Sequence, residues 1–538
     1  MVANNFKSIS STQTIFTIEN KNTLPKDGVN FETAIELCEY GKFHYSVIIV
    51  CGLIFVFGGC QSGINSYIIP AAECDLNLNS HQKGLINTAF LIGGMSSSFL
   101  WGISANAYGR KRILVGTLLT DSLLTFLSSL SQSFEVLVVF RAFAGFLIGA
   151  PGSLIYNYLG EFHTSKLRVK CMCIIGFCWT SASLLLPGLA WFIIPLKFSF
   201  EFAGFIFNSW RLYLGLIGVP TLVLGFILTM YPESPKYLLS RGRKQEALEI
   251  LREIYAVNTG RNKSDYPVKE LKISTDEIDE RNKLSIEVTI DDASNLLVIK
   301  RLLKEACREI KTLTSTPHVK WALLCWTIYF TNLFGWYGFG IWMPELLNRF
   351  ENFYKLHPNI TTASVSELVS LNQTSTIRKY DCENHSMNEK VFVNTLIINA
   401  ACSIGNIMCI YLSNHVGRRT IPVTTLIVSG VAGVALYFIR SSTQIIIVSG
   451  IFSVAMTAAN IVLNSTVVDI FPTHISALAL CINSFFGRIG AIVSNIAFGA
   501  LVDVNCEVLI FLVASIIIVG AMLAFFLPPK DPPRVLET

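Results

Sequence analysis

The sequence predicts an all-α membrane protein whose twelve transmembrane helices form two pseudo-symmetric bundles of six. Three observations lead to this fold class: an apolar composition, regularly spaced apolar runs, and a basic turn that recurs in each half of the chain. Of the 538 residues, 52% are hydrophobic and only 15% are charged, which is too apolar for a soluble protein of this length. Runs of about 20 apolar residues cross a bilayer as helices, because hydrocarbon offers no hydrogen bonds to the backbone.

A polar segment divides the apolar runs into two groups of six. The first group lies at about 44–66, 84–105, 113–132, 134–158, 170–194 and 210–231, and the second at about 319–346, 391–412, 421–439, 443–467, 474–500 and 506–528. We therefore expect a tail (1–43), an N-terminal bundle (44–231), a linker (232–318), a C-terminal bundle (319–528) with a long loop (347–390), and a second tail (529–538). The first 43 residues lack the apolar core of a cleavable signal, so the first span is expected to direct insertion.

The basic residues of the short loops predict which side of the protein faces the cytoplasm. Arg110, Lys111 and Arg112 follow the second run of the first group, and Arg418 and Arg419 follow the second run of the other group. The positive-inside rule therefore places these turns, both tails and the linker in the cytoplasm. The short loops of the opposite side offer only Lys83, Lys197 and Arg440.

The linker contains two amphipathic stretches. In the first, Gly260 is the expected stop, and the second runs over about 296–313. We expect both to form helices that pack under the bundle on the cytoplasmic face, with binding of lipid or of a partner protein as the alternative. The apolar positions at helical spacing in the first stretch are Ala247, Leu248, Leu251, Ile254 and Tyr255.

The long loop 347–390 contains three acceptor sequons for N-glycosylation, at Asn359, Asn372 and Asn384. Since this loop is predicted on the non-cytoplasmic side, we expect it to be glycosylated and to face a lumen or the cell exterior. Cys74 and Cys382 lie in loops on the same side, where an oxidising compartment permits a disulfide. Whether these two pair with each other is left open by the sequence.

The duplicated halves and their basic turns resemble the major facilitator superfamily over nearly the whole chain. The first turn matches the pattern of that superfamily through Gly102, Asn106, Gly109, Arg110 and Lys111, and the second through Asn414, Gly417, Arg418 and Arg419. In both turns an asparagine replaces the usual acid. The carboxylate–arginine ion pair of the superfamily is therefore not expected here, although an amide can still accept a hydrogen bond.

Further motifs resemble the sugar-porter and organic-ion-carrier relatives within that superfamily. Span four carries Arg141, Gly145 and Gly149 at four-residue spacing, and Glu161 is followed by Arg168. Glu233 lies in a Pro-Glu-Ser-Pro-Lys sequence after span six. Asp469 precedes Pro472 and Thr473, but Ser476 stands where these relatives place an arginine. The resemblance implies a cytoplasmic charge network with fewer members than usual.

Several stretches resemble the synaptic vesicle glycoprotein 2 group. These are Cys38–Phe43 before span one, Pro70–Glu73 at its end, Trp336–Gly338 in span seven, and the sequence around Arg488 in span eleven. The resemblance implies a synaptic or secretory vesicle, or the plasma membrane, as the location. The loop after span seven is much shorter than in that group, so a diverged relative is expected.

Two repeated halves predict alternating access, with a solute bound near the midplane between them. The basic turns, led by Arg110 and Lys111, are expected to hold helix ends in one state, the alternative being a role in topology alone. Ionisable residues within the spans are scarce, and span one has Gln61 where the resemblance predicts an acid. Asp121 in span three is the remaining candidate for proton coupling. A carboxylate that merely faces Arg141 or another helix is the alternative.

The candidates for contact with a solute are neutral amides and aromatic side chains. They suit a sugar, a neutral amine or a drug-like ring, whereas an anion would need several cationic anchors. The alternative is that these side chains only form hydrogen bonds between helices. The candidates are Gln61, Asn65, Asn157, Tyr158, Asn332, Trp336, Tyr337, Asn460 and Asn464.

We expect a monomeric secondary transporter of a small polar or amphiphilic organic solute in a lipid bilayer. The alternative is a vesicle protein that transports weakly or not at all and regulates other vesicle proteins. The chain lacks a basic patch interleaved with aromatic residues, so nucleic acid is not an expected partner. It also lacks a phosphate-binding loop, a cluster with metal-ligand spacing and a nucleophile turn, so neither enzymatic activity, nor a metal, nor a cofactor is expected.

Overall fold

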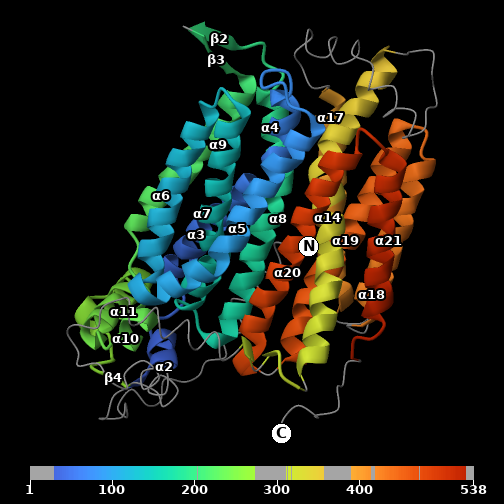
Figure 1. Cartoon of the computed structure of the whole chain (residues 1–538). Coiled ribbons are helices and arrows are strands. Elements are labelled where there is room, and N and C mark those ends of the chain that lie inside the picture. Colours follow the sequence, from blue (N-terminus) through green and yellow to red (C-terminus); the bar gives the residue numbers. More distant parts are fainter. Residues whose placement is uncertain are drawn as a thin grey trace, which may run out of the picture. The chain divides into compact units, whose positions relative to one another are not determined.

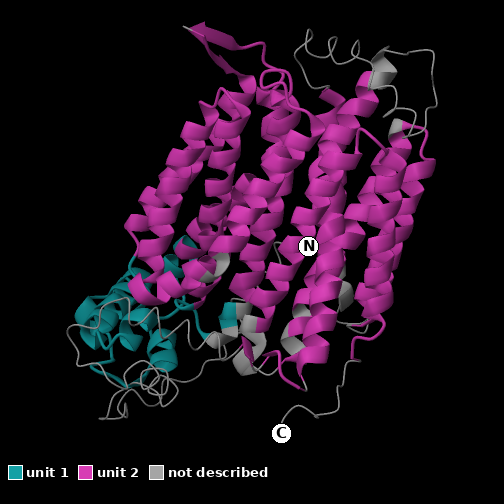
Figure 2. Ribbon diagram, viewed as in Figure 1, with its two compact units in different colours: residues 1–46, 161–168, 232–288 teal, residues 47–160, 169–231, 289–538 magenta. Residues whose placement is uncertain are grey.

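The computed structural model describes residues 29–202, 204–272, 310–311, 313–316, 318–356, 389–413, 419–471 and 473–528. The chain divides into two compact units (Figure 2). Unit 1 comprises residues 1–46, 161–168 and 232–288, and unit 2 comprises residues 47–160, 169–231 and 289–538. Unit 2 is built from long helices, whereas the described part of unit 1 contains short helices and two short strands.

Each of the twelve predicted spans coincides with a helical segment of the described chain (Figure 1), which confirms the predicted fold class. The N-terminal half contains α3 (Lys42–Gly63) continued by α4 (Asn65–Ala72), α5 (Ser80–Tyr108), α6 (Arg110–Ser129), α7 (Phe134–Gly160), α8 (Ser165–Ile193) and α9 (Ser209–Thr229). The C-terminal half contains α14 (His318–Leu356), α17 (Glu389–Ser413), α18 (Thr420–Ala435) with η2 (Leu436–Phe438), α19 (Ser442–Ile470), α20 (Thr473–Leu501) and α21 (Cys506–Ala524).

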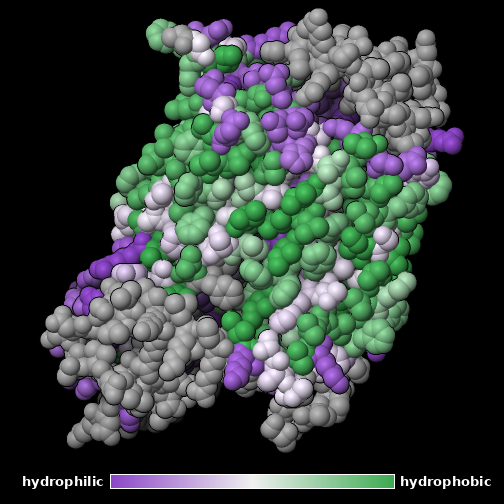
Figure 3. Space-filling model, in the orientation of Figure 1, coloured by the Kyte–Doolittle hydropathy of each residue, from purple (hydrophilic) through white to green (hydrophobic). Residues whose placement is uncertain are grey.

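Length and hydropathy alone select eight of these described segments as membrane spans, or nine if the bent α5 counts as one. The other three, α6, α14 and α17, are less apolar; α6 begins with three basic residues and contains Asp121. Figure 3 shows a belt of hydrophobic side chains across the visible helices and hydrophilic side chains at their upper ends. Side chains such as Phe143 and Val431 are more than half exposed, as expected where lipid is the solvent.

Local sequence explains where α5 begins and ends. The Asn79 side chain accepts a hydrogen bond from the backbone of Gln82, and the Gln82 side chain accepts one from the backbone of Asn79, which is a complete capping box. Gly109 has a φ of 106° between α5 and α6, a conformation that glycine adopts without steric cost. The glycine of the basic turn is therefore required by the backbone itself.

The glycine spacing of span four lets α7 pack closely against α5. A Cβ atom on Gly145 would overlap the carbonyl oxygen of Phe90, and one on Gly149 would overlap the hydroxyl of Ser97. These two positions lie one helical turn apart on the same face of α7, so both are needed for the close approach. The motif thus has a packing role that the sequence resemblance left unspecified.

Within unit 2, the two halves pack against each other along α5 and α20 and between α4 and α14. One difference from the predicted boundaries concerns the long loop, because α14 continues as a helix to Leu356 instead of ending near residue 346. Arg349 lies on this extra segment and is held by ion pairs described below. A short ribbon of β2 (Ser199–Phe202) and β3 (Phe205–Asn208) joins α8 to α9.

Unit 1 contains α2 (Phe31–Glu36), α10 (Pro235–Ser240), α11 (Lys244–Thr259) and η1 (Lys263–Asp265), with β1 (Val29–Asn30) and β4 (Leu271–Lys272) paired in parallel. The first predicted amphipathic helix is confirmed as α11, which buries all five apolar positions of its stripe. Gly260 ends it in the left-handed conformation, with a φ of 73°. The second predicted amphipathic stretch, apart from its last residues, lies outside the described residues.

Candidate functional site

A buried network of polar side chains lies inside the N-terminal half. Gln61 of α3 donates a hydrogen bond from Nε2 to Asp121 Oδ2 in α6 at 3.2 Å, and its Oε1 accepts one from Arg141 Nη2 in α7 at 3.4 Å. Arg141 Nη1 also donates to Asn65 Oδ1 of α4 at 3.3 Å. Gln61, Asn65, Asp121 and Arg141 are each 3% exposed or less. The Gln61 amide therefore joins α3 to α6 and α7, and Arg141 adds α4 through Asn65.

The Gln61 amide connects a buried acid to a buried cation. Asp121 Oδ1 and Arg141 Nε have no hydrogen-bond partner among the described residues, so the network is only partly satisfied. An incompletely paired charge in a region of low dielectric constant is costly, and water or a polar ligand could complete it. The alternative expected from the sequence was that Asp121 faces Arg141. In the structure, Gln61 bonds to both residues and connects them.

The candidates of the C-terminal half lie on α14 and α19. Asn332 is fully buried, and neither polar atom of its side chain has a hydrogen-bond partner among the described residues. Asn464 Oδ1 accepts a hydrogen bond from Tyr329 at 2.9 Å, whereas the buried Asn460 Oδ1 has no described partner. Trp336 and Tyr337 are half-buried. Among the described residues, the C-terminal half therefore holds three amides with unused hydrogen-bonding capacity: Asn332, Asn460 and Asn483 of α20.

Arg488 of α20 reaches the N-terminal half of unit 2. Its Nη1 lies where a Cβ atom added to Gly94 of α5 would be only 2.8 Å away. Of the remaining cavity candidates, Tyr158 is buried and Asn157 is exposed, so the neighbours Asn157 and Tyr158 have different surroundings. The structure brings Gln61 and Asn65 together and leaves Asn157 apart from them.

The structure describes only some residues of the motifs that were predicted on the cytoplasmic side. Arg110 Nη1 donates to the carbonyl of Ala105 at 3.3 Å, which caps the end of α5. In unit 1, Arg168 Nη2 lies 2.9 Å from Glu32 Oε1, and Glu233 accepts a hydrogen bond from the backbone of Ser234. Gly102, Asn106, Lys111, Arg112, Glu161 and Arg419 lie within the described residues, whereas Asn414, Gly417, Arg418 and the side chain of Asp469 lie outside them.

A cluster of charged residues joins the two halves at the end of unit 2 predicted to face away from the cytoplasm. Lys83 Nζ of α5 lies 2.7 Å from Glu73 Oε2 and 2.6 Å from Glu345 Oε1 of α14. Arg349 Nε lies 2.9 Å from the same Glu345 oxygen, and its Nη1 lies 2.8 Å from Asp503 Oδ1. We call these five residues, Glu73, Lys83, Glu345, Arg349 and Asp503, the outer latch.

Burial makes the outer latch energetically important. The side chain of Lys83 is 1% exposed and that of Glu345 is 6% exposed. Removing one partner of such a pair leaves an uncompensated buried charge, which typically costs about 3–5 kcal/mol. Two uncharged contacts also cross between the halves: Asn399 Nδ2 of α17 donates to the Ser183 carbonyl of α8 at 2.7 Å, and Tyr67 stacks on Phe392.

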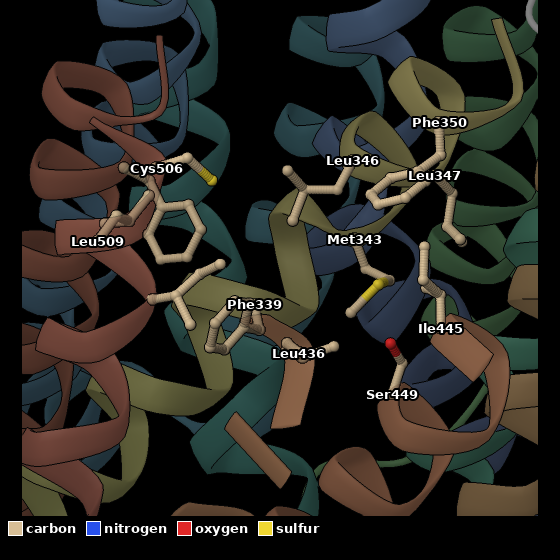
Figure 4. A pocket seen from close by; sticks show the side chains of 12 residues that line it. Phe339, Met343, Leu346, Leu347, Phe350, Leu436, Ile445, Ser449, Cys506 and Leu509 are labelled. Atoms are coloured by element: carbon tan, nitrogen blue, oxygen red, sulfur yellow. The ribbon is translucent and has the colours of Figure 1, made fainter. Parts of the chain in front are cut away.

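A small pocket extends from the buried network to the outer latch. Its lining comes from both halves and includes Asn65, Asn87, Lys83, Trp342 and Glu345. A second pocket lies wholly within the C-terminal half and is lined by apolar side chains together with Ser449 (Figure 4). Only the first pocket combines amide, charged and aromatic groups, which is the chemistry that binds a polar solute.

The sequence reading missed the outer latch. From the sequence, Lys83 was noted only as a residue of a short loop on the non-cytoplasmic side, and Glu345 and Arg349 were not singled out. The available signal was an acid at the end of an apolar run, since an ionisable residue there is expected to have a partner. Which residue pairs with Glu345 could not be read, because Lys83 is 262 positions away in the chain.

The residues of the predicted glycosylated loop, Asn359, Asn372 and Asn384, lie outside the described residues. Cys74 is disulfide-bonded, which agrees with an oxidising compartment on that side. Cys382, the other cysteine expected on that side, lies outside the described residues. Among the described residues, no group of three or more His, Cys, Asp and Glu side chains could hold a metal ion.

Solved transporters share this fold. The chain is similar to the partially occluded inward-open xylose transporter XylE from E. coli, with a TM-score of 0.61 and 15% identity over 91% of this chain and 99% of that chain. It is also similar to a D-xylose-proton symporter, with a TM-score of 0.60 and 15% identity over the same shares. The fold and the site together define a multi-pass integral membrane protein with the major facilitator fold.

Sequence comparisons specify the family. The family described as "Sugar (and other) transporter" matches residues 33–303, half of the chain, and the one described as "Major Facilitator Superfamily" matches residues 393–538. The chain belongs to the sugar (and other) transporter family. It is similar to synaptic vesicle glycoprotein 2B of Homo sapiens, with 23% identity over 93% of this chain and 85% of that protein. Synaptic vesicle glycoprotein 2C of Mus musculus is 22% identical over 93% and 80%.

Proposed function

We propose that this protein is a secondary transporter that moves a small, neutral polar or amphiphilic organic solute by alternating access. The observation that carries the proposal is the pocket between the halves, which begins at Asn65 and ends at Lys83 and Glu345. A solute bound there would contact amides of the buried network and lie directly beneath the outer latch. Opening of the latch would then connect the same site to the other side of the membrane.

The chemistry of the lining favours a neutral solute. The lining of the pocket includes the amides Asn65 and Asn87 of the N-terminal half and the ring of Trp342 of the C-terminal half. The proposed binding site extends beyond this lining to Gln61 and to the unpaired amide of Asn332. Amides offer both donors and acceptors, and rings pack on apolar faces, which suits a sugar or a neutral amine. The network contains one cation, Arg141, and one acid, Asp121, so it offers no excess positive charge for an anion.

Asp121 is the candidate coupling residue of this transporter. Its Oδ1 has no described partner, and Gln61 connects its other oxygen to Arg141. A proton on Asp121 would weaken its attraction for Arg141 and change the hydrogen bonds that Gln61 makes. Because Arg141 also holds Asn65 of the pocket, protonation would alter the binding site.

Uptake by the purified protein in liposomes tests this proposal. A panel of radiolabelled sugars, neutral amines and organic ions is presented with and without an imposed pH gradient. We expect saturable uptake of at least one neutral solute. The replacement Asn332→Ala should weaken its binding about tenfold, the effect of losing roughly 1.4 kcal/mol of hydrogen bonding.

The choice of Asn332 separates solute binding from folding. Neither side-chain atom of Asn332 bonds to a described residue, so its truncation removes no described hydrogen bond. The matched control is Asn157→Ala, which changes an exposed amide and should leave uptake unchanged. If both variants take up the solute with the same kinetics as the parent protein, Asn332 is not part of the binding site. If no solute of the panel is taken up, the proposed transport function is contradicted.

A second candidate function is a vesicle membrane protein that transports weakly or not at all and regulates other vesicle proteins. Two observations favour it: the similarity to synaptic vesicle glycoproteins 2B and 2C, and Gln61 where the family resemblance predicts an acid in span one. In the liposome experiment this function predicts saturable binding of a solute without uptake. The location proposed for both candidate functions is a synaptic or secretory vesicle membrane or the plasma membrane.

A further inference from the structure

The ribbon between α8 and α9 carries an unusual concentration of phenylalanine. Its two strands pair in antiparallel register, with Phe200 opposite Phe207 and Phe202 opposite Phe205. Directly opposed residues, and residues two apart in one strand, lie on the same face of a ribbon. All four phenylalanines therefore share one face, while the opposite face carries Ser199, Glu201, Ile206 and Asn208.

The β2 part of the aromatic face is exposed in the isolated protein, whereas Phe205 and Phe207 of β3 are half-buried. Phe200 is 58% exposed and Phe202 is 70% exposed, and every residue of β2 is exposed. No described segment of the chain covers these two rings. Large apolar side chains that share one exposed face indicate a surface that contacts something other than water.

The ribbon is held firmly to the N-terminal half. The Gln132 side chain makes two hydrogen bonds to the backbone of Ile206, donating to its carbonyl at 2.9 Å and accepting from its N–H at 3.2 Å. At the base of β3, Asp75 accepts hydrogen bonds from Asn208, from Trp210 Nε1 at 2.6 Å and from Arg211 Nη1 at 3.0 Å. These hydrogen bonds therefore fix the orientation of the aromatic face relative to the N-terminal half.

The position of the ribbon identifies the surface that it contacts. β3 ends at Asn208 and α9 begins at Ser209, so the ribbon starts directly at the end of a membrane span. Four residues of strand extend about 13 Å, and the headgroup layer on each side of a bilayer is about 5–8 Å thick. Exposed aromatic side chains also lie close to the ribbon in the sequence, because Phe192 at the end of α8 is 73% exposed and Phe198 is 45% exposed.

We propose that the β2–β3 ribbon lies in the lipid interface of the non-cytoplasmic leaflet, with Phe200, Phe202, Phe205 and Phe207 facing the acyl chains. Aromatic side chains are favoured at this depth, and an amphipathic element binds there with its polar face toward the headgroups and water. Since Gln132 and Asp75 belong to the N-terminal half, the ribbon anchors the outer end of that half in the membrane.

Fluorescence quenching in reconstituted vesicles tests the proposal. Tryptophan is introduced as Phe202→Trp on the aromatic face or as Glu201→Trp on the opposite face, and the signal of the parent protein is subtracted. In phosphatidylcholine vesicles brominated near the headgroup, we expect quenching of the added tryptophan at 202 to exceed that at 201 by about twofold or more. Aqueous iodide should show the opposite order.

A second variant on the same face controls for misfolding of the first. Phe200→Trp lies on the same face as position 202, and it should reproduce the quenching of Phe202→Trp. If iodide quenches the aromatic face and brominated lipid does not, the ribbon lies in water and the proposal fails. If neither quencher reaches position 202, another protein surface covers the ribbon, and the lipid assignment is likewise overturned.

Discussion

Lys83 Nζ lies 2.6 Å from Glu345 Oε1, and this contact joins a helix of the N-terminal half to a helix of the C-terminal half. The two residues are 262 positions apart and both are almost completely buried. Glu345 also contacts Arg349, which in turn contacts Asp503, so a single carboxylate connects the outer ends of α5, α14 and the α20–α21 loop. In a protein that works by alternating access, this cluster must separate before the outer side can open.

Breaking the Lys83–Glu345 contact should destabilise the protein strongly. Lys83→Met leaves Glu345 with one fewer cation, and we expect a loss of about 3–5 kcal/mol in unfolding free energy. Thermal unfolding of the detergent-solubilised variant measures the effect. The double variant Lys83→Met/Glu345→Leu removes both charges and should recover part of the loss, since two apolar side chains replace the pair.

An exposed ion pair provides the control for that experiment. Arg243 and Glu246 of α11 form a contact in which both side chains are about half exposed. Arg243→Gln should change the unfolding temperature little, because exposed pairs contribute about 0–1 kcal/mol. Equal effects of Lys83→Met and Arg243→Gln would contradict the special role assigned to the outer latch.

The outer latch should tolerate mild acidification. Burial alone would raise the pKa of Asp503, but Arg349 outweighs this and holds the pKa of the carboxyl below its ordinary value. The stabilising contribution of a group with a lowered pKa is present above the ordinary pKa and is lost as the pH falls through the folded pKa. The stability difference between the parent protein and Asp503→Asn should therefore stay constant from pH 7 to about 5 and shrink only below about 4. A difference that already disappears at pH 6 would contradict this.

The Asp121→Asn variant should still transport the solute but should no longer respond to a pH gradient. The replacement keeps the size of the side chain and its ability to bond Gln61, but it removes the charge and the proton-binding site. If Asp121 couples transport to protons, uptake down a solute gradient should persist while stimulation by a pH gradient disappears. The liposome assay with and without the pH gradient measures both. Stimulation that survives in the variant would leave Asp121 as a structural partner of Gln61 and Arg141.

Neutralising the basic turn should slow transport without preventing insertion. Arg110 bonds the carbonyl of Ala105 at the end of α5, and Lys111 is its neighbour in the turn. Arg110→Ala/Lys111→Ala should lower the rate of solute uptake, since helix ends released from the turn no longer hold one state. Glycosylation of the loop 347–390 reports correct topology in the same sample. Unchanged uptake kinetics would reduce both residues to topology signals.

Glycosylation itself tests the predicted orientation. Asn359→Gln, Asn372→Gln and Asn384→Gln should each increase the electrophoretic mobility of the protein expressed in cells, and the triple variant should match the enzymatically deglycosylated protein. Asn262→Gln is the matched control, because its sequon lies in the predicted cytoplasmic linker and should carry no glycan. A mobility change in the control together with none in the loop variants would show that the topology is inverted.

Much of the fold follows from local properties of the sequence. The predicted starts of three spans lie within one residue of the observed helix starts, which are Phe134 for α7, Ser209 for α9 and Cys506 for α21. This agreement arises because lipid requires long apolar runs with turn residues between them. The C-terminal end of α14 was missed by ten residues. Polar side chains such as Asn348 and Arg349 are typical of a loop in sequence, whereas in the structure Arg349 pairs with Asp503 of another segment.

The candidate site was predictable only in part. Polar residues within spans were recognised individually, namely Gln61, Asn65, Asp121 and Arg141. Their connection through Gln61 and Arg141 depends on how α3, α4, α6 and α7 pack. Asn157 has the same chemistry and proved to be exposed. Residue type identifies a polar group, but helix rotation and tilt, which are set by neighbouring helices, decide where that group points.

By itself, the sequence determined the membrane class of this protein, its duplicated halves, the number of its spans and the glycines that its turns and close contacts require. These properties depend on short-range chemistry: apolar length, local basic charge and backbone conformations that only glycine adopts readily. The tertiary structure alone decided that Gln61 connects Asp121 to Arg141, that Lys83 meets Glu345, and that four phenylalanines share one face of the β2–β3 ribbon. Each of these relationships joins separate segments, and register and packing between segments are not encoded in the periodicity of either one.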